Sequence, residues 1–119
     1  MRPSLARQLQ LIRCISLDVT GTLLTHTHPI YETYSKCAFL SGLNDPPTPE
    51  ELKPAFKQAY KQACLESPGF GSQAGISSRT WWAHTVRGAL THCGRSYSDA
   101  DFDRYFRRVY QHYGTPVSF

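Results

Sequence analysis

The apolar residues of this chain fall into one short continuous run and four longer stretches with helical spacing. The continuous run covers residues 11–17 and ends at Asp18, and Gly21 follows within a few residues. A short apolar run that stops at a turn signal is typical of a strand buried in a parallel sheet. The pattern therefore predicts one strand, then a tight turn, and helices after it.

The four later stretches repeat their apolar residues at i, i+3, i+4 and i+7, as amphipathic helices do. The second stretch has the clearest start, because Thr48 and Glu51 form a capping box around Pro49 at the first helical position. Pro54 lies within its first turns and is expected to disturb the helix entry. The four predicted helices cover roughly residues 30–41, 48–64, 78–93 and 98–113.

A single buried strand does not make a sheet. It needs partner strands on both edges and cover on both faces, and residues 18–114 show no further strand pattern. A new extended segment is expected to begin at residues 115–119. We therefore expect an α/β protein whose core is represented here by its first strand alone, followed by a mainly α-helical domain of four helices.

Composition narrows the classes of protein that the chain can be. The 119 residues are 40% apolar and 18% charged, which indicates a globular chain, and no apolar run approaches the length of a membrane span. The net charge is +4, with the densest basic cluster at Arg104, Arg107 and Arg108. Nucleic-acid-binding proteins carry such clusters, but the neighbouring aromatic residues fall on the opposite stripe of the helix. A solvated helix face is the favoured interpretation, and neither nucleic acid nor a membrane is expected as a partner.

The spacing of the cysteines indicates whether they could bind a metal and in which cellular compartment the chain is expected. No close cysteine pair occurs, so ordinary buried thiols are favoured over a zinc site. Reduced thiols indicate an intracellular location, cytoplasmic or nuclear. Arginines without an acidic residue before Asp18 leave a mitochondrial leader open. The four cysteines are Cys14, Cys37, Cys64 and Cys93.

The turn after the predicted strand carries the chemistry. A carboxylate at the carboxyl end of a parallel strand lies at the ligand-binding edge of the sheet, which is where Asp18 is expected. Gly21 allows the sharp turn, and backbone amides with the Thr22 hydroxyl can receive phosphate oxygens. Asp18 can then attack phosphorus as a covalent nucleophile beside a Mg²⁺ ion. The alternative is that Asp18 merely caps a turn.

Residues 18–23 resemble the D-x-D-G-T-L motif of the haloacid dehalogenase superfamily. Residues 28–34, 56–61 and 78–82 are similar to segments of a helical cap found in that family, and the resemblance covers roughly residues 9–119. It implies a Rossmann-like core with a helical cap inserted after the first strand. Residues 1–27 would be the first strand and nucleophile loop, 28–114 the cap, and 115–119 the return to the core of a longer protein.

The resemblance also implies residue roles and a reaction. Asp18 would be the nucleophile and a Mg²⁺ ligand, Thr20 would offer its carbonyl oxygen to the metal, and Gly21 and Thr22 would bind the substrate phosphate. The full-length protein would hydrolyse a small phosphate ester or phosphoanhydride through an aspartyl-phosphate.

Thr20 departs from the family pattern, which has a titratable aspartate there for proton transfer. Slow hydrolysis, a substrate with a good leaving group and lost activity all remain open. The later motifs of the family lie beyond residue 119, so this chain alone is expected to be inactive. The competing hypothesis is a non-catalytic family member whose helices bind a partner.

Two further groups of residues allow both a functional and a structural interpretation. Arg79 could direct its guanidinium at an anionic substrate, with Trp82 as a pocket wall. The favoured alternative packs Trp82 in the helical bundle, with Trp81 half-shielding it and Arg79 in solvent. His26 and His28 are interpreted as loop residues rather than metal ligands, because no third ligand is near them in sequence.

Overall fold

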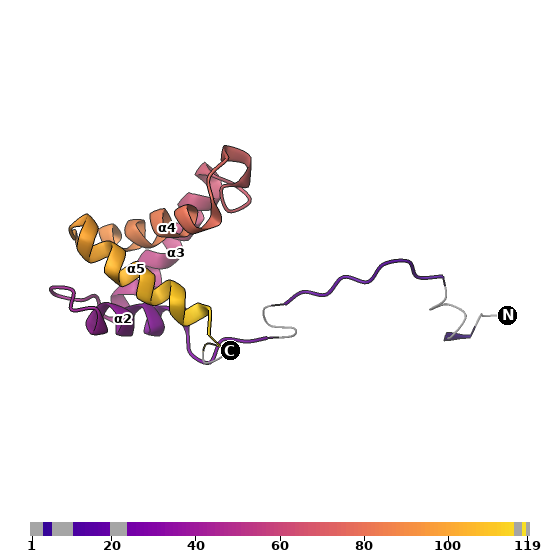
Figure 1. The fold of residues 1–119 in the computed structure, drawn as a ribbon, viewed down its shortest axis with the longest axis horizontal. Helices are drawn as coiled ribbons and strands as arrows, with labels where there is room; N and C mark the ends of the chain where they lie inside the picture. The colour runs from indigo at the N-terminus through magenta and orange to yellow at the C-terminus, as the bar shows by residue number, and fades with distance from the viewer. Residues whose placement is uncertain (1–3, 6–10, 20–23, 116–117, 119) are drawn as a thin grey trace.

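The computed structural model describes residues 4–5, 11–19, 24–115 and 118, and the ordered part of these residues is a bundle of α-helices. Helix α3 packs most extensively on α4, while α2 contacts α3 and α5, and α5 also contacts α4. Figure 1 shows the four helices gathered at one end of the molecule. Their bounds are Ile30–Leu40 for α2, Pro49–Glu66 for α3, Ser78–His92 for α4 and Asp99–Tyr113 for α5, with a short 3₁₀ turn at Ser72–Ala74 between α3 and α4.

The helix limits follow from local capping chemistry, as the sequence predicts. The hydroxyls of Thr48, Ser77 and Ser98 each accept a hydrogen bond from a backbone N–H three residues later, which satisfies a free donor of the first helical turn. The capping box at Thr48 is complete. After α2 and α4, Gly42 and Gly94 adopt φ values of +74° and +75°, a left-handed conformation that glycine enters without steric cost.

The core lies where the apolar stripes of the four helices meet. Tyr105 of α5 is fully buried, and its hydroxyl donates to the backbone carbonyl of Tyr34 in α2 at 3.1 Å. This bond satisfies a polar group that would otherwise be costly to bury, and it ties the last helix to the first. Around it pack buried aliphatic residues of α3, α4 and α5, among them Leu52, Val86, Leu90 and Val109.

The structure corrects the interpretation of the two tryptophans. Trp81 is the buried residue, with 2% of its surface exposed, and Trp82 is only partly buried. The indole N–H of Trp81 donates to the carbonyl of Ser67 at 2.9 Å, and the Phe70 ring lies 5.2 Å away. The physical reason is the loop between α3 and α4. It folds over the side of α4 that carries Trp81 and approaches so closely that a Cβ at Gly71 would lie 3.3 Å from the indole.

The strand predicted at residues 11–17 is not formed. Residues 11–19 adopt neither helix nor strand, their side chains are exposed, and the segment runs away from the helices in Figure 1. The described residues include no second strand that could pair with this segment. A strand gains its backbone hydrogen bonds from a neighbour, so an apolar run without one stays extended in solvent.

The two ends of the helical unit meet. The backbone N–H of Thr27, just before α2, donates to the carbonyl of Ser118, just after α5, at 2.9 Å. Figure 1 shows the incoming and outgoing chain side by side at this point. A helical unit inserted into another domain must begin and end at one place, and this one does. The domain limits 1–27, 28–114 and 115–119 themselves stay predictions.

A surface network ties the loop before α5 to the start of α3. The Arg95 guanidinium donates to the Glu51 carboxylate and lies 3.5 Å from the Asp45 carboxylate. The hydrogen bond from Arg95 holds the pKa of the Glu51 carboxyl below its usual 4.5. Because this pKa is lowered in the folded chain, the ionised form of Glu51 contributes stability above about pH 4.5, and that contribution is lost as the pH falls.

Replacing Glu51 with glutamine should therefore lower the free energy of unfolding at pH 7, and the deficit should shrink when the pH is lowered below about 4. Urea unfolding followed by circular dichroism from pH 7 to pH 3 measures both effects. Glu50→Gln is the matched control, because Glu50 lies beside Glu51 in the first turn of α3. Equal pH dependence of the two variants would contradict the assignment.

No helix in the described part of the chain has the length and apolar character needed to cross a membrane.

Candidate functional site

The predicted nucleophile loop is only partly covered by the structure. Thr20, Gly21 and Thr22 lie outside the described residues, so their predicted roles are untested. Asp18 is described and is exposed, in the segment that precedes the helical unit. The described chain resumes at Leu24 and continues from there into the helical unit.

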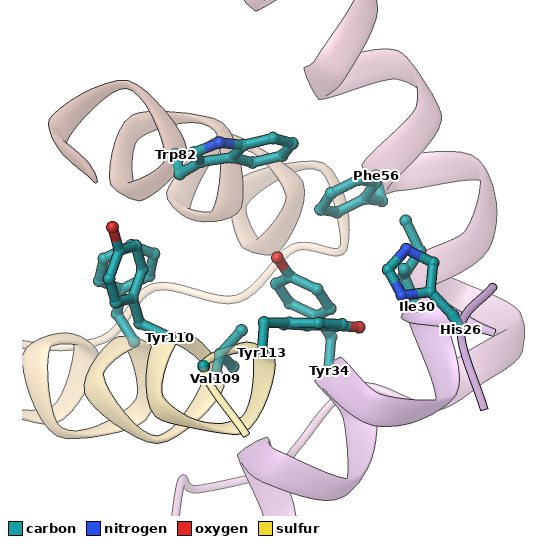
Figure 2. Close-up of a pocket in the computed structure, with 10 residues that line it drawn as sticks. His26, Ile30, Tyr34, Phe56, Trp82, Val109, Tyr110 and Tyr113 are labelled. Atoms are coloured by element: carbon teal, nitrogen blue, oxygen red, sulfur yellow. The ribbon is translucent and has the colours of Figure 1, made fainter. Parts of the chain in front are cut away.

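A larger feature lies within the helical unit itself. A cleft of about 480 Å³ opens between α2, α3, α4 and α5, close to the paired chain ends (Figure 2). Its size falls within the range of small-molecule sites, which are concave, mostly apolar and carry a few polar groups. It is lined by His26, Ile30, Tyr34, Phe56, Trp82, Phe106, Val109, Tyr110, Tyr113 and Gly114.

Aromatic rings form most of the cleft wall. The ring centroids of Tyr34 lie 5.1 Å from Phe56 and 6.1 Å from Tyr113, and His26 meets Tyr113 edge to face at 5.5 Å. Figure 2 shows the Tyr34 hydroxyl pointing into the cleft, toward the side of Phe56 and Trp82. Burial raises the pKa of Tyr34, so this hydroxyl stays neutral and can donate a hydrogen bond.

A second, smaller cleft of about 370 Å³ shares a wall with the first. Ile30, Phe56 and Trp82 line both. The second cleft adds two lysines of α3, Lys53 and Lys57, together with Tyr31 and Tyr60. The Lys53 ammonium lies 5.4 Å from the centre of the Tyr31 ring, a cation–π distance. The surface of the second cleft is nonetheless almost wholly apolar, so two apolar clefts are adjacent.

Arg79 lies beside a residue that lines the aromatic cleft. Its side chain is exposed, and its guanidinium carbon is 5.4 Å from the centre of the Tyr110 ring, which lines the cleft. Trp82 lines the cleft. Binding of a substrate by Arg79 stays a prediction.

A metal site is not formed by the described residues. Among residues 4–5, 11–19, 24–115 and 118, no three His, Cys, Asp or Glu side chains gather in one place. Mg²⁺ takes oxygen ligands, often one or two carboxylates, and keeps several waters. Asp18 offers one suitable carboxylate, but the rest of a coordination sphere is not found in the described part of the chain.

The basic cluster of α5 has a structural role. Arg104 donates to the Ser41 carbonyl at 2.9 Å, and Arg108 donates to the Ser41 hydroxyl at 3.2 Å. Arg107 pairs with Asp103 at 3.0 Å. Two of the three arginines thus bind the C-terminal end of α2, where a positive charge is favourable.

No family model matches the chain. Curated proteins named haloacid dehalogenase-like hydrolase domain-containing protein 3 do match. The chain is 38% identical to the one from Homo sapiens over 82 residues, covering 69% of this chain and 32% of that protein. It is 30% identical to the one from Danio rerio over 105 residues, covering 88% of this chain and 42% of that protein.

The protein of the same name from Bos taurus is 37% identical over 90 residues, covering 76% of this chain and 35% of that protein. The chain thus spans about a third to two fifths of the length of the curated relatives that it matches.

Proposed function

We propose that this chain, a relative of the haloacid dehalogenase-like hydrolases over most of its length, supplies the nucleophile loop and helical cap of a phosphohydrolase. The observation that supports this proposal most directly is the pairing of Thr27 with Ser118. It brings together the two ends of a helical unit whose first helix begins at Ile30, twelve residues after Asp18. A cap inserted behind a nucleophile loop requires that arrangement.

In the proposed reaction, a carboxylate oxygen of Asp18 attacks the phosphorus atom of the substrate. An oxygen–phosphorus bond forms, and the bond to the leaving group breaks. Water then attacks the phosphorus of the aspartyl-phosphate, which releases inorganic phosphate and restores the carboxylate. The family relationship suggests a metal cofactor. We propose Mg²⁺, which would offset the repulsion between the carboxylate and the phosphate, with Asp18 and the Thr20 carbonyl among its ligands.

Thr20 shapes the substrate class that we propose. A threonine hydroxyl does not give up or take a proton near neutral pH, so it cannot protonate a poor leaving group. The chain would therefore favour substrates whose leaving group departs without a proton, such as acyl phosphates and phosphoanhydrides. Alkyl phosphate esters would react slowly.

The expected substrate preference can be tested in a chimeric protein. In this chimera, the chain replaces the matching segment of a curated relative. With Mg²⁺ present, we expect faster phosphate release from acetyl phosphate than from glycerol phosphate, and loss of both on addition of EDTA. Thr20→Asp should raise turnover of glycerol phosphate about 100-fold, the lower end of the range for general acid–base catalysis. Thr20→Asn is the control of similar size without a proton to transfer. Equal rates for Asp and Asn would contradict the role of position 20.

A second candidate function is a non-catalytic binding module. Thr20, in place of a titratable residue, is the observation that favours it. A chimera that folds but releases no phosphate from any of these substrates would support this alternative over the enzyme.

A further inference from the structure

We infer that the aromatic cleft binds a neutral, flat organic molecule whose hydrogen-bond acceptor, such as a carbonyl oxygen, meets the Tyr34 hydroxyl. The cleft lies between the four helices and close to the paired ends of the helical unit. Binding of such a molecule requires neither Asp18 nor a reaction, so the site is separable from the proposed function.

The Tyr34 hydroxyl is the polar group that points to a ligand. Tyr34 is only 7% exposed, and Figure 2 shows its hydroxyl directed into the cleft, on the side of Phe56 and Trp82. A buried tyrosine usually finds a hydrogen-bond partner for this group. Within the described part of the chain, no residue bonds to this hydroxyl, and the bond from Tyr105 reaches the Tyr34 backbone carbonyl instead. The hydroxyl is therefore available to a molecule that enters the cleft.

The surroundings of Tyr34 make its hydroxyl a fixed donor. Burial raises the pKa of Tyr34, so the hydroxyl keeps its proton at neutral pH and can donate it to a carbonyl oxygen. The ring is held in place, because it packs against Phe56 at 5.1 Å and Tyr113 at 6.1 Å. The backbone carbonyl of the same residue accepts from Tyr105. A donor that is already in position loses little freedom when a ligand binds.

The rest of the cleft wall limits the charge and the shape of the ligand. No Lys, Arg, Asp or Glu among the described residues lines the cleft. A charged ligand would therefore lose its hydration there without meeting a side chain of fixed opposite charge, whereas a neutral one avoids that cost. Phe56, Trp82 and Tyr110 present aromatic rings, on which flat molecules stack (Figure 2). The volume of about 480 Å³ lies in the range of small-molecule sites.

The role of the hydroxyl can be tested in the 119-residue chain with Tyr34→Phe, which deletes one oxygen and keeps the ring. The two probes are 2-acetylnaphthalene, which has a carbonyl oxygen, and 2-ethylnaphthalene, which has nearly the same shape without that oxygen. Equilibrium dialysis measures both dissociation constants. Quenching of tryptophan fluorescence provides a second readout, because Trp82 lines the cleft. We expect saturable one-to-one binding of both probes to the unmodified chain.

Tyr34→Phe should weaken binding of acetylnaphthalene about three- to tenfold, the usual effect of one neutral hydrogen bond, and should change binding of ethylnaphthalene less than about twofold. Tyr110→Phe is the matched control, because it removes a hydroxyl from another tyrosine of the same cleft that is 46% exposed. It should change the binding of either probe less than about twofold. Trp82→Ala should weaken both probes about threefold or more. Circular dichroism confirms that each variant is folded.

Equal effects of Tyr34→Phe on the two probes, or equal effects of the two tyrosine variants on acetylnaphthalene, would overturn the assignment of Tyr34. Absence of saturable acetylnaphthalene binding would overturn the site. So would a dimer, detected by sedimentation, that Trp82→Ala disrupts, because the cleft would then be an interface between two copies. Asp18→Asn should bind acetylnaphthalene as tightly as the unmodified chain does. Retained binding without turnover in the chimera would count against the proposed function alone.

Discussion

Replacing Trp81 with alanine should lower the free energy of unfolding by about 3–5 kcal/mol, the usual cost of deleting a large buried aromatic side chain. The Trp81 indole is almost completely buried, donates to the Ser67 carbonyl at 2.9 Å and meets the rings of Phe70 and Tyr60 edge to face. Its removal would leave a cavity beneath the loop between α3 and α4 and would take one of two hydrogen bonds from the Ser67 carbonyl, which also accepts from the Gly71 backbone N–H at 3.2 Å. Urea unfolding monitored by circular dichroism measures the loss.

Trp82→Ala is the matched comparison, because it deletes the same side chain from the next position of the same helix. Trp82 is partly exposed and lines the aromatic cleft, so its loss should cost less than half as much. Trp81→Phe keeps a ring but removes the N–H donor, and it should be intermediate, because the Ser67 carbonyl loses the indole hydrogen bond and keeps the one from the Gly71 backbone N–H. A larger loss at Trp82 than at Trp81 would contradict the burial pattern described above.

The tryptophan pair shows what a helical stripe can and cannot predict. Positions 85, 86, 89 and 90 belong to the buried side of α4 in both sequence and structure. Trp81 and Trp82 lie at the two edges of that stripe, and helical spacing fits either one. The loop over Trp81 decides between them, and its path depends on turns at Gly69, Gly71 and Gly75, all with positive φ. The apolar spacing within one helix does not show which of its residues a loop from elsewhere in the chain will cover.

Helix limits were predictable because their causes are local. A capping hydroxyl binds a backbone N–H three residues away, and a glycine after the last turn ends the helix through its own backbone conformation. A strand differs, since its partner lies on another segment of chain. Residues 11–17 have the composition of a buried strand but lack that partner among the described residues, so composition alone was insufficient.

The candidate site also has one part that the sequence predicts and one part that depends on how the helices pack. The Asp18 motif is contiguous in sequence and could be identified from it. The aromatic cleft is assembled from four helices, and Tyr34, Phe56 and Val109 lie on stripes that are indistinguishable from ordinary core. The basic residues of α5 were correctly interpreted as helix surface, but their binding to Ser41 at the end of α2 depends on how the two helices pack.

Asp18→Asn should have the largest effect on function. In the chimera that carries this chain, phosphate release from acetyl phosphate should fall at least about 10⁴-fold, because the amide is nearly the same size but is a far weaker nucleophile than the carboxylate. The control is Asp103→Asn, which removes an exposed carboxylate paired with Arg107 on α5 and should leave the rate close to that of the unmodified chimera. Phosphate release at saturating Mg²⁺ measures both.

The outcomes of the Asp18 experiment discriminate between the two functional hypotheses. Unchanged turnover in Asp18→Asn would exclude Asp18 as the nucleophile. Absence of turnover in the folded, unmodified chimera would instead favour the binding module. The exposure of Asp18 does not weigh against its proposed role, since a nucleophile must be reachable by substrate. What the role requires is a fixed position, and sheet partners for residues 11–17 would provide it by holding the carboxylate at a strand end. The strand and the activity should therefore appear together, in the same chimera and not in the chain alone.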